Sequence, residues 1–313
     1  MKGGAKVGTF HCPLGSPFYD SDDCILCELC TAITKEEMVA ATGRIRAYLQ
    51  AQAERKSGFK KIAICGKGGV GKSTVVTLMG QALREEGYEV LVIDTDESNP
   101  GLYRMLGFDK EPRPLMKLLS RFSMGEPEPD TEWITRDEIP IQDIPSEYLL
   151  QKDSLKFIMV GKIMDPFEGC ACTMADVTRD LMGKLKLNDK EVVLIDAEAG
   201  VESFGRGVER NCDTVLIIVE PSFESIALAE KIRYLADGIG VRMVRAILNK
   251  VPSEETRKEM VEKLAQKQVS QIGTVHLDPE ISQAGFTGKA LGQSKAKEEI
   301  KEITRRLLDE AKK

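Results

Sequence analysis

The feature that most constrains this chain is a glycine-rich run between two apolar segments, Lys67-Gly68-Gly69-Val70-Gly71-Lys72-Ser73-Thr74. Residues 60–65 before it resemble a short buried strand, and the apolar residues of 75–83 after it recur at helical spacing. A strand, a glycine turn and a helix start form a phosphate-binding loop, because the backbone N–H groups and the positive helix end attract an anion. In such a loop Lys72 is placed for the β- and γ-phosphates, and the Ser73 hydroxyl for Mg²⁺. We expect Gly66 and residues 68–74 to hold the phosphates of ATP.

Composition restricts the kind of protein that surrounds this loop. The chain has 313 residues, of which 42% are hydrophobic, enough for one large core or one core with a small appendage. Its net charge of −6 argues against nucleic acid as the main partner. No apolar run approaches the length of a membrane span and no signal peptide is evident, so a cytoplasmic protein without stable membrane association is expected.

Four cysteines near the N-terminus predict a metal site, namely Cys12, Cys24, Cys27 and Cys30. Three closely spaced thiolates and a remote Cys-Pro pair are typical of a [4Fe–4S] cluster, although here the remote cysteine comes first. Zinc is the alternative, since four thiolates also suit a structural zinc site. We predict a cysteine-rich module over residues 1–33. A capping box at Thr34–Glu37 then begins a linker helix over 34–58, and an ATPase domain fills 59–313.

Carboxylates follow two of the predicted buried strands. Asp94 and Asp96 follow residues 89–93, and Asp196 follows residues 192–195. Strands alternating with helical segments predict an α/β fold, a doubly wound and mostly parallel sheet whose ligands bind at the carboxyl ends of the strands. These aspartates therefore belong near the nucleotide, with helix capping as the alternative role for Asp96.

A second cysteine group, Cys170-Ala171-Cys172, precedes a predicted helix. Two thiolates cannot complete four-coordination alone, but two copies across a dimer axis supply four ligands. The pair therefore predicts a metal ion or Fe–S cluster shared by Cys170 and Cys172 of two chains. The two remaining cysteines, Cys65 and Cys212, are expected to be small core residues.

The lysine at the start of the loop, Lys67, makes the run resemble the deviant Walker A branch of P-loop ATPases, which includes MinD, the nitrogenase iron protein and metal-centre maturation factors. Residues 168–172, 196–207, 219–222 and 249–251 are similar to the CooC type, the nickel-insertion ATPases of carbon monoxide dehydrogenase maturation. The resemblance implies that Lys67 reaches the partner's nucleotide and Asp96 orients the attacking water. It also implies that Asp196 holds Mg²⁺ through water and that Asn249 recognises adenine. It further implies a homodimer that holds Ni²⁺ or Zn²⁺, or a shared Fe–S cluster, at Cys170 and Cys172. Ser203 departs from the type, which has a histidine there.

Three hypotheses follow. The first is an ATPase that delivers nickel to a carbon monoxide dehydrogenase or acetyl-CoA synthase-like client enzyme. The second is an ATP-driven electron donor resembling the nitrogenase iron protein, which would use a cluster at either cysteine group. The third, a positioning switch resembling MinD, uses neither group.

Overall fold

The computed structural model describes residues 59–96, 101–118, 131–161, 171–205, 207–288 and 290–312. The chain divides into two units, Met1–Gly58 and Phe59–Lys313, and the description below concerns the second. The predicted cysteine module, the linker helix and Cys170 lie outside the described residues.

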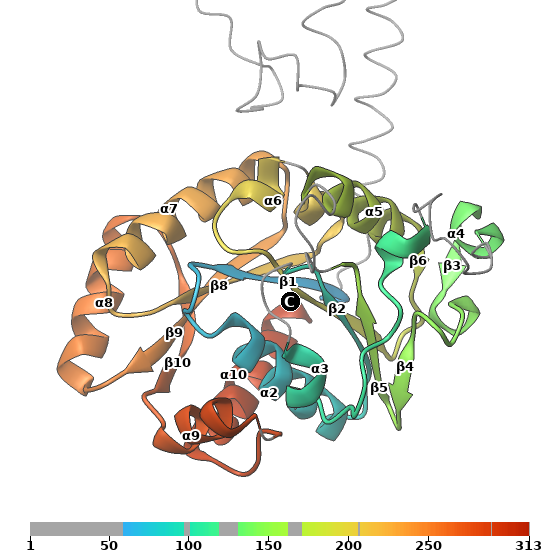
Figure 1. The fold of residues 1–313 in the computed structure, drawn as a ribbon. Coiled ribbons are helices and arrows are strands. Elements are labelled where there is room, and N and C mark those ends of the chain that lie inside the picture. The colour runs from blue at the N-terminus through green and yellow to red at the C-terminus, as the bar shows by residue number, and fades with distance from the viewer. Residues whose placement is uncertain are drawn as a thin grey trace, which may run out of the picture. The chain divides into compact units, whose positions relative to one another are not determined.

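The larger sheet has eight strands in the order β10-β9-β8-β1-β7-β2-β5-β4 (Figure 1). Every neighbouring pair in it is parallel except β4 and β5, so the prediction of a mostly parallel α/β sheet is confirmed. Its strands are β1 (Lys61–Gly66), β2 (Glu89–Asp94), β4 (Leu150–Lys152), β5 (Leu155–Met159), β7 (Glu191–Asp196), β8 (Thr214–Val219), β9 (Met243–Val251) and β10 (Gln271–His276). A two-stranded sheet pairs β3 (Ile139–Pro140) with β6 (Leu185–Lys186).

Helices cover both faces of the large sheet (Figure 1). They are α2 (Lys72–Glu85), α3 (Leu102–Met105), α4 (Glu132–Thr135), α5 (Ala171–Lys184), α6 (Glu202–Gly205), α7 (Phe223–Gly238), α8 (Glu254–Gln266), α9 (Pro279–Thr287) and α10 (Lys295–Ala311). Three 3₁₀ turns join them, η2 (Leu115–Leu118), η3 (Ile141–Asp143) and η4 (Val208–Asn211). Because strands between two helical layers are buried on both sides, β1, β2, β7 and β8 are almost continuously apolar.

Two hydrophobic clusters form the core, one on each face of the sheet. The first includes side chains of α5, α7 and α8, and the second includes those of α2, α3 and α10. Ile300, Ile303 and Leu307 of α10 are buried in the second cluster, so this C-terminal helix packs on the domain. Gly273 lets α10 approach β10, because a Cβ there would lie 2.3 Å from Ile303 Cγ1.

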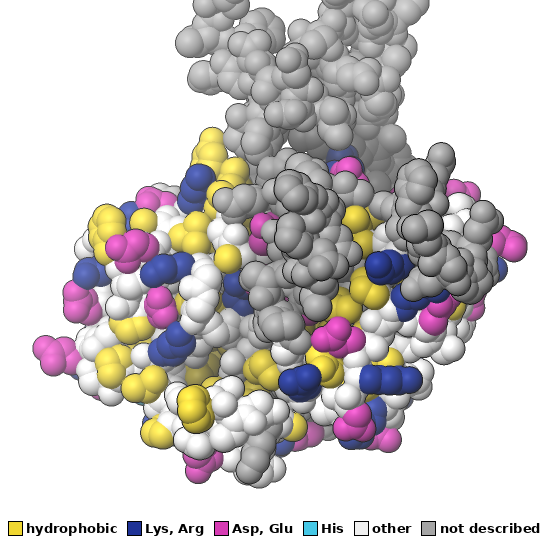
Figure 2. All heavy atoms as spheres, viewed as in Figure 1, with side chains coloured by type: hydrophobic (Ala, Val, Ile, Leu, Met, Phe, Trp, Pro, Cys, Tyr) yellow, Lys and Arg dark blue, Asp and Glu magenta, His cyan; other side chains and the backbone are white. Residues whose placement is uncertain are grey.

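The surface in Figure 2 carries acidic and basic side chains interspersed, wherever described residues are visible. In the described part of the chain, no helix has the length and apolarity needed to cross a membrane.

Candidate nucleotide site

The glycine-rich run forms the turn between β1 and α2, as the sequence predicts. Gly66 has φ +148, and a Cβ there would lie 2.7 Å from the Ile218 carbonyl oxygen of the neighbouring strand. Gly71 is the N-cap of α2 with φ 102, and no side chain caps that end of the helix. The first turn of α2 also contains no acidic residue. Its N–H groups and dipole are therefore left for an anion.

Lys72 begins α2 and is only 5% exposed. Within the described ranges, its side chain has no hydrogen bond or ion pair. Its positive charge opposes the rise that burial causes in the pKa of the nearby Asp196 carboxyl, and a buried ammonium group is stabilised by such negative charge or by a bound anion. The burial of Lys72 agrees with its predicted contact with a phosphate.

The residues expected to hold Mg²⁺ are Ser73 and Asp196, and the fold brings them together. Ser73 Oγ donates a hydrogen bond of 2.5 Å to Asp196 Oδ2. Asp196 is fully buried and its Oδ1 atom has no hydrogen-bond partner. Burial, followed by repulsion from Asp94, raises the pKa of Asp196 to about 7. A hydroxyl and a carboxylate with an unsatisfied buried oxygen fit Mg²⁺, which prefers oxygen ligands and stabilises the ionised carboxylate.

Asp94 and Asp96 lie at the carboxyl end of β2, beside Asp196. Asp94 pairs with Asp196 in the register of β2 and β7, and the backbone N–H of Asp96 donates to Asp94 Oδ1 at 3.1 Å. Thr95 Oγ1 donates to the Asp196 carbonyl oxygen at 2.9 Å, which ties the two strand ends together. The next described helix, α3, has Gly101 as its N-cap, so Asp96 does not cap it.

A bulge in β9 directs two consecutive side chains to the phosphate-binding loop. The pairing of β9 with β10 shifts register between Leu248 and Val251, and Lys250 has φ 57, unusual for a non-glycine residue. Asn249 Nδ2 donates to the Val70 carbonyl oxygen at 2.8 Å, and Lys250 Nζ donates to the Gly69 carbonyl oxygen at 2.5 Å. These bonds anchor the outer side of the loop. The predicted contact of Asn249 with adenine stays a prediction.

Lys67 lies at the edge of the site, with its side chain 40% exposed. Its Nζ atom is 3.5 Å from Glu220 Oε1, and Lys250 Nζ is 3.3 Å from Glu220 Oε2. In the single chain, Lys67, which was predicted to act on a partner's nucleotide, is therefore paired with Glu220 of its own chain. Glu220 and Lys250 were not predicted as site residues. The position of Glu220 directly after the buried strand β8 is a usable signal, whereas Lys250 lies within β9.

The segment after Asp196 connects the loop to α5. The N–H of Gly200 donates to the Gly66 carbonyl oxygen at 3.2 Å. Further along, Ser203 Oγ donates to the Glu209 carboxylate, which is fully buried and has its pKa raised to about 7 by burial. Asn211 Nδ2 then donates to the Arg179 carbonyl oxygen in α5 at 3.2 Å. Hydrogen bonds and packing thus connect the strand end that carries Asp196 to α5.

The predicted metal-binding cysteines cannot be placed with the same detail. Cys12, Cys24, Cys27, Cys30 and Cys170 lie outside the described residues, and Cys172 lies in the first turn of α5 without a described side chain. No group of three or more His, Cys, Asp or Glu side chains suited to a metal ion occurs among the described residues. Cys65 and Cys212 are buried, and neither forms a disulfide within the described part of the chain, as expected for core residues. Burial raises the pKa of the Cys65 thiol, which disfavours its reactive thiolate form.

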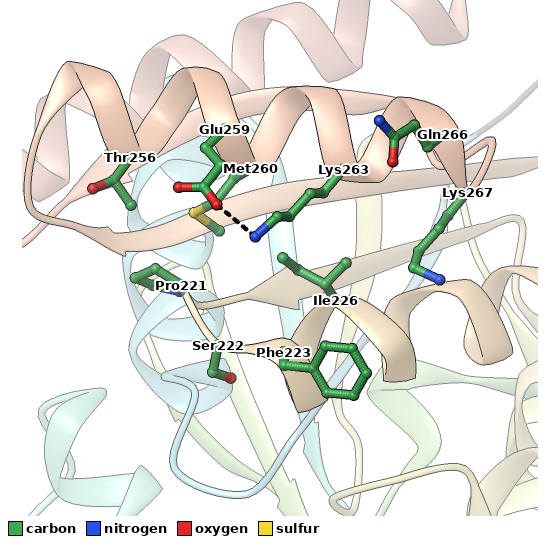
Figure 3. Close-up of a pocket in the computed structure, with 10 residues that line it drawn as sticks. All are labelled: Pro221, Ser222, Phe223, Ile226, Thr256, Glu259, Met260, Lys263, Gln266 and Lys267. Atoms are coloured by element: carbon green, nitrogen blue, oxygen red, sulfur yellow. Dashed lines mark ion pairs between the residues drawn. The ribbon is translucent and has the colours of Figure 1, made fainter.

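A groove of about 380 Å³ lies between α7 and α8, next to the turn that carries Glu220 (Figure 3). Pro221, Ile226 and Met260 line it, and Lys263 pairs with Glu259 along its rim at 2.5 Å. The side chain of Phe223 lines the groove and is 82% exposed. The loop residues predicted to bind phosphate are not part of its lining.

Comparison with known families agrees with this geometry. Residues 61–291 match the CobQ/CobB/MinD/ParA nucleotide binding domain. The chain belongs to this family. It is an ATPase of the P-loop class, with the glycine-rich turn between β1 and α2 and the mostly parallel strand order described above.

Similar proteins extend the comparison. An uncharacterised ATP-binding protein of Methanocaldococcus jannaschii is 40% identical over 252 residues, which covers 78% of this chain and 97% of that protein. The carbon monoxide dehydrogenase accessory protein CooC of Rhodospirillum rubrum is 35% identical over 200 residues, covering 62% of this chain and 75% of that protein.

Among solved structures, MinD of Aquifex aeolicus in complex with MinC has a TM-score of 0.58 at 21% identity, covering 80% of this chain and 96% of that chain. MinD of Pyrococcus horikoshii with Mg-ADP has a TM-score of 0.58 at 17% identity, covering 79% and 95%. These two structures support the fold alone.

Proposed function

We propose that this protein is an ATP-dependent maturation factor that delivers nickel to a carbon monoxide dehydrogenase or acetyl-CoA synthase-like enzyme. The observation that carries the proposal is the link from the nucleotide site to α5, the helix whose first turn contains Cys172. The similarity to the CooC accessory protein of Rhodospirillum rubrum, at 35% identity, supports the same function. In this proposal nickel is the ion that is delivered, and hydrolysis of ATP with Mg²⁺ supplies the free energy.

Each residue of the nucleotide site has a role in hydrolysis under this proposal. The N–H groups of residues 66–74 and the buried ammonium of Lys72 bind the phosphates, while Ser73 and Asp196 hold Mg²⁺, which neutralises developing charge. Asp96 orients the attacking water, and Asn249 contacts the adenine. Lys67 acts on the nucleotide of the partner in a homodimer, and a charge supplied in this way raises the rate by about 10³–10⁵.

The homodimer explains how hydrolysis could move a metal ion. Cys170 and Cys172 of two chains supply four thiolates, and ATP favours the closed pair of chains. Hydrolysis changes the segment after Asp196, which contacts α5 through η4, and so changes the geometry at the cysteines. A thousandfold bias between the two states requires about 4 kcal/mol, which differential contacts to the γ-phosphate can supply.

The N-terminal residues 1–33 form a separate cysteine-rich module in this proposal, joined to the ATPase by a helix over 34–58. Its cysteines Cys12, Cys24, Cys27 and Cys30 would hold a [4Fe–4S] cluster or Zn²⁺. We place the protein in the cytoplasm, with the client enzyme as partner and without nucleic acid or stable membrane association.

The second candidate function is an ATP-driven Fe–S electron donor. It is favoured by the two cysteine groups and by a 60-residue match, 45% identical, to the iron–sulfur cluster carrier protein of Pyrococcus horikoshii. That match covers 19% of the chain. A positioning switch like MinD leaves both cysteine groups without a role, so it is the weakest of the three.

Anaerobic metal analysis separates these functions. The full chain is purified without oxygen, loaded with Ni²⁺, and compared with a Cys170→Ala/Cys172→Ala variant by metal content and electron paramagnetic resonance. Cys65→Ala/Cys212→Ala, which removes two buried thiols, is the matched control. Nickel delivery predicts Ni²⁺ lost only from the first variant and no reducible cluster at this pair. A cluster signal at Cys170 and Cys172 that responds to ATP would instead support electron transfer.

A further inference from the structure

Glu220 lies between two lysines that flank the phosphate-binding loop. Its Oε1 is 3.5 Å from Lys67 Nζ, and its Oε2 is 3.3 Å from Lys250 Nζ. Lys250 in turn holds the Gly69 carbonyl oxygen at 2.5 Å. The Glu220 carboxylate therefore forms ion pairs with Lys67 at the start of the loop and with Lys250, which anchors the middle of the loop.

The fold fixes the position of this carboxylate. Strands β8 and β1 are parallel neighbours, with Ile218 opposite Gly66, so the residues after both strands emerge side by side. The backbone N–H of Glu220 donates to Ser225 Oγ at 3.1 Å, and Ser222 caps α7 directly after Pro221. The turn is thus fixed by its own hydrogen bonds, and the Glu220 side chain is only 21% exposed.

A lysine that serves the nucleotide of a partner must first leave this carboxylate. We propose that Glu220 is a positioning residue that keeps Lys67 on its own chain until a second ATP-bound chain offers the stronger negative charge of its phosphates. This inference rests on the proposed role of Lys67 in a homodimer. It means that the Lys67–Glu220 ion pair opposes dimer closure.

Removing the charge of Glu220 should therefore favour the dimer. Glu220→Gln keeps the shape of the side chain but releases Lys67. A partly exposed ion pair of this kind shifts an equilibrium by roughly two- to fivefold, and a dimer contains two such pairs. We expect the dimer dissociation constant to fall by roughly four- to twenty-fivefold.

The test measures dimerisation of the full chain by analytical ultracentrifugation with saturating Mg²⁺ and the non-hydrolysable analogue AMPPNP. Glu224→Gln is the matched control, because it removes the same charge from an exposed residue in the first turn of α7. Thermal unfolding of both variants without nucleotide checks that the fold is intact. Glu220→Gln should tighten the dimer and Glu224→Gln should not.

The same comparison is made in a Lys67→Ala background, where Lys67 is absent and Glu220 retains, of its two described ion pairs, the one with Lys250. Loss of the Glu220→Gln effect in that background supports the inference. A Glu220→Gln dimer that is unchanged or weaker than wild type, or an effect that persists without Lys67, overturns it. If the wild-type chain itself stays monomeric with AMPPNP, the proposed homodimer fails, and this inference fails with it.

Discussion

The buried carboxylate of Asp196 should make the ligand-free protein less stable as the pH rises. Its pKa is raised from 3.8 to about 7, mainly by burial. The folded protein therefore binds more protons than the unfolded chain between these two pH values, so the free energy of unfolding falls as the pH increases through this window. Below about pH 4 the group has no effect, and above about pH 7 the full penalty is present.

The size of this penalty follows from the same values. The difference between 3.8 and about 7 corresponds to about 4 kcal/mol, at about 1.4 kcal/mol per pKa unit. Asp196→Asn removes the charge, but it leaves a buried amide incompletely bonded, which costs about 1–3 kcal/mol. The variant should therefore gain about 1–3 kcal/mol above pH 7, or roughly 2–10 °C in Tm.

Thermal unfolding in EDTA without nucleotide, from pH 5 to pH 8.5, measures this difference. Asp109→Asn, at an exposed position, is the control and should show no pH-dependent gain. The Asp196→Asn protein should also lose the stabilisation that Mg²⁺-ADP gives to the wild type, together with ATP hydrolysis. A wild-type stability that does not fall relative to the variant between pH 5 and pH 7 would refute the reasoning.

Three further predictions concern the same loop and its connections. Lys72→Ala should leave Tm within a few degrees of wild type. It should reduce ATP hydrolysis at least a hundredfold in a phosphate-release assay, because the buried ammonium is removed. Hydrolysis at the wild-type rate would contradict the role of Lys72. Gly71→Ala should weaken nucleotide binding at least tenfold in calorimetry, since φ is 102 and the new Cβ would lie 2.5 Å from Asn249 Nδ2. An unchanged affinity would show that the loop tolerates a Cβ at this position. Glu209→Gln keeps the hydrogen bond to Ser203 but removes a carboxyl whose pKa is raised to about 7. The variant should therefore have a higher Tm than wild type above pH 7 but not at pH 4. A Tm difference that is the same at both pH values would argue against a buried charge.

The nucleotide site was predictable because its signals are local. The loop, the strand before it and the helix after it are contiguous, and the three aspartates follow directly from buried apolar runs. Parallel strands then bring Asp94 and Asp196 to the same edge of the sheet. Ser73 and Asp196 are 123 residues apart in the chain, and they were predicted to meet because parallel strands place their carboxyl ends at one edge of the sheet.

The contacts around Lys67 were not predictable in the same way. Lys250 reaches the loop because β9 contains a bulge and this residue adopts a positive φ. No glycine marks either feature at this point of the sequence. Glu220 depends on the adjacency of β8 and β1, which are separated by most of the domain in sequence. The buried pair of Ser203 and Glu209 likewise depends on how the segment after β7 folds back.

The region over 112–150 is rich in Pro, Glu, Asp and Ser, so its sequence predicts only an irregular insertion with short helices. The structure adds β4, an antiparallel edge strand, and pairs Ile139–Pro140 with Leu185–Lys186 across a long stretch of chain. Such short pairings carry little periodicity, because two or three residues per strand cannot establish an alternation. Their partners are chosen by tertiary packing, which a local pattern does not encode.

The central claim is that two chains share one metal ion through Cys170 and Cys172 while ATP controls how they associate. The most direct measurement is the mass and nickel content of the anaerobic full chain, loaded with Ni²⁺, in AMPPNP and in ADP. The account predicts a dimer with one nickel ion per two chains at this pair in AMPPNP, and loss of that ion in Cys170→Ala/Cys172→Ala. A monomer in AMPPNP whose nickel content is unaffected by removing both thiols would contradict it.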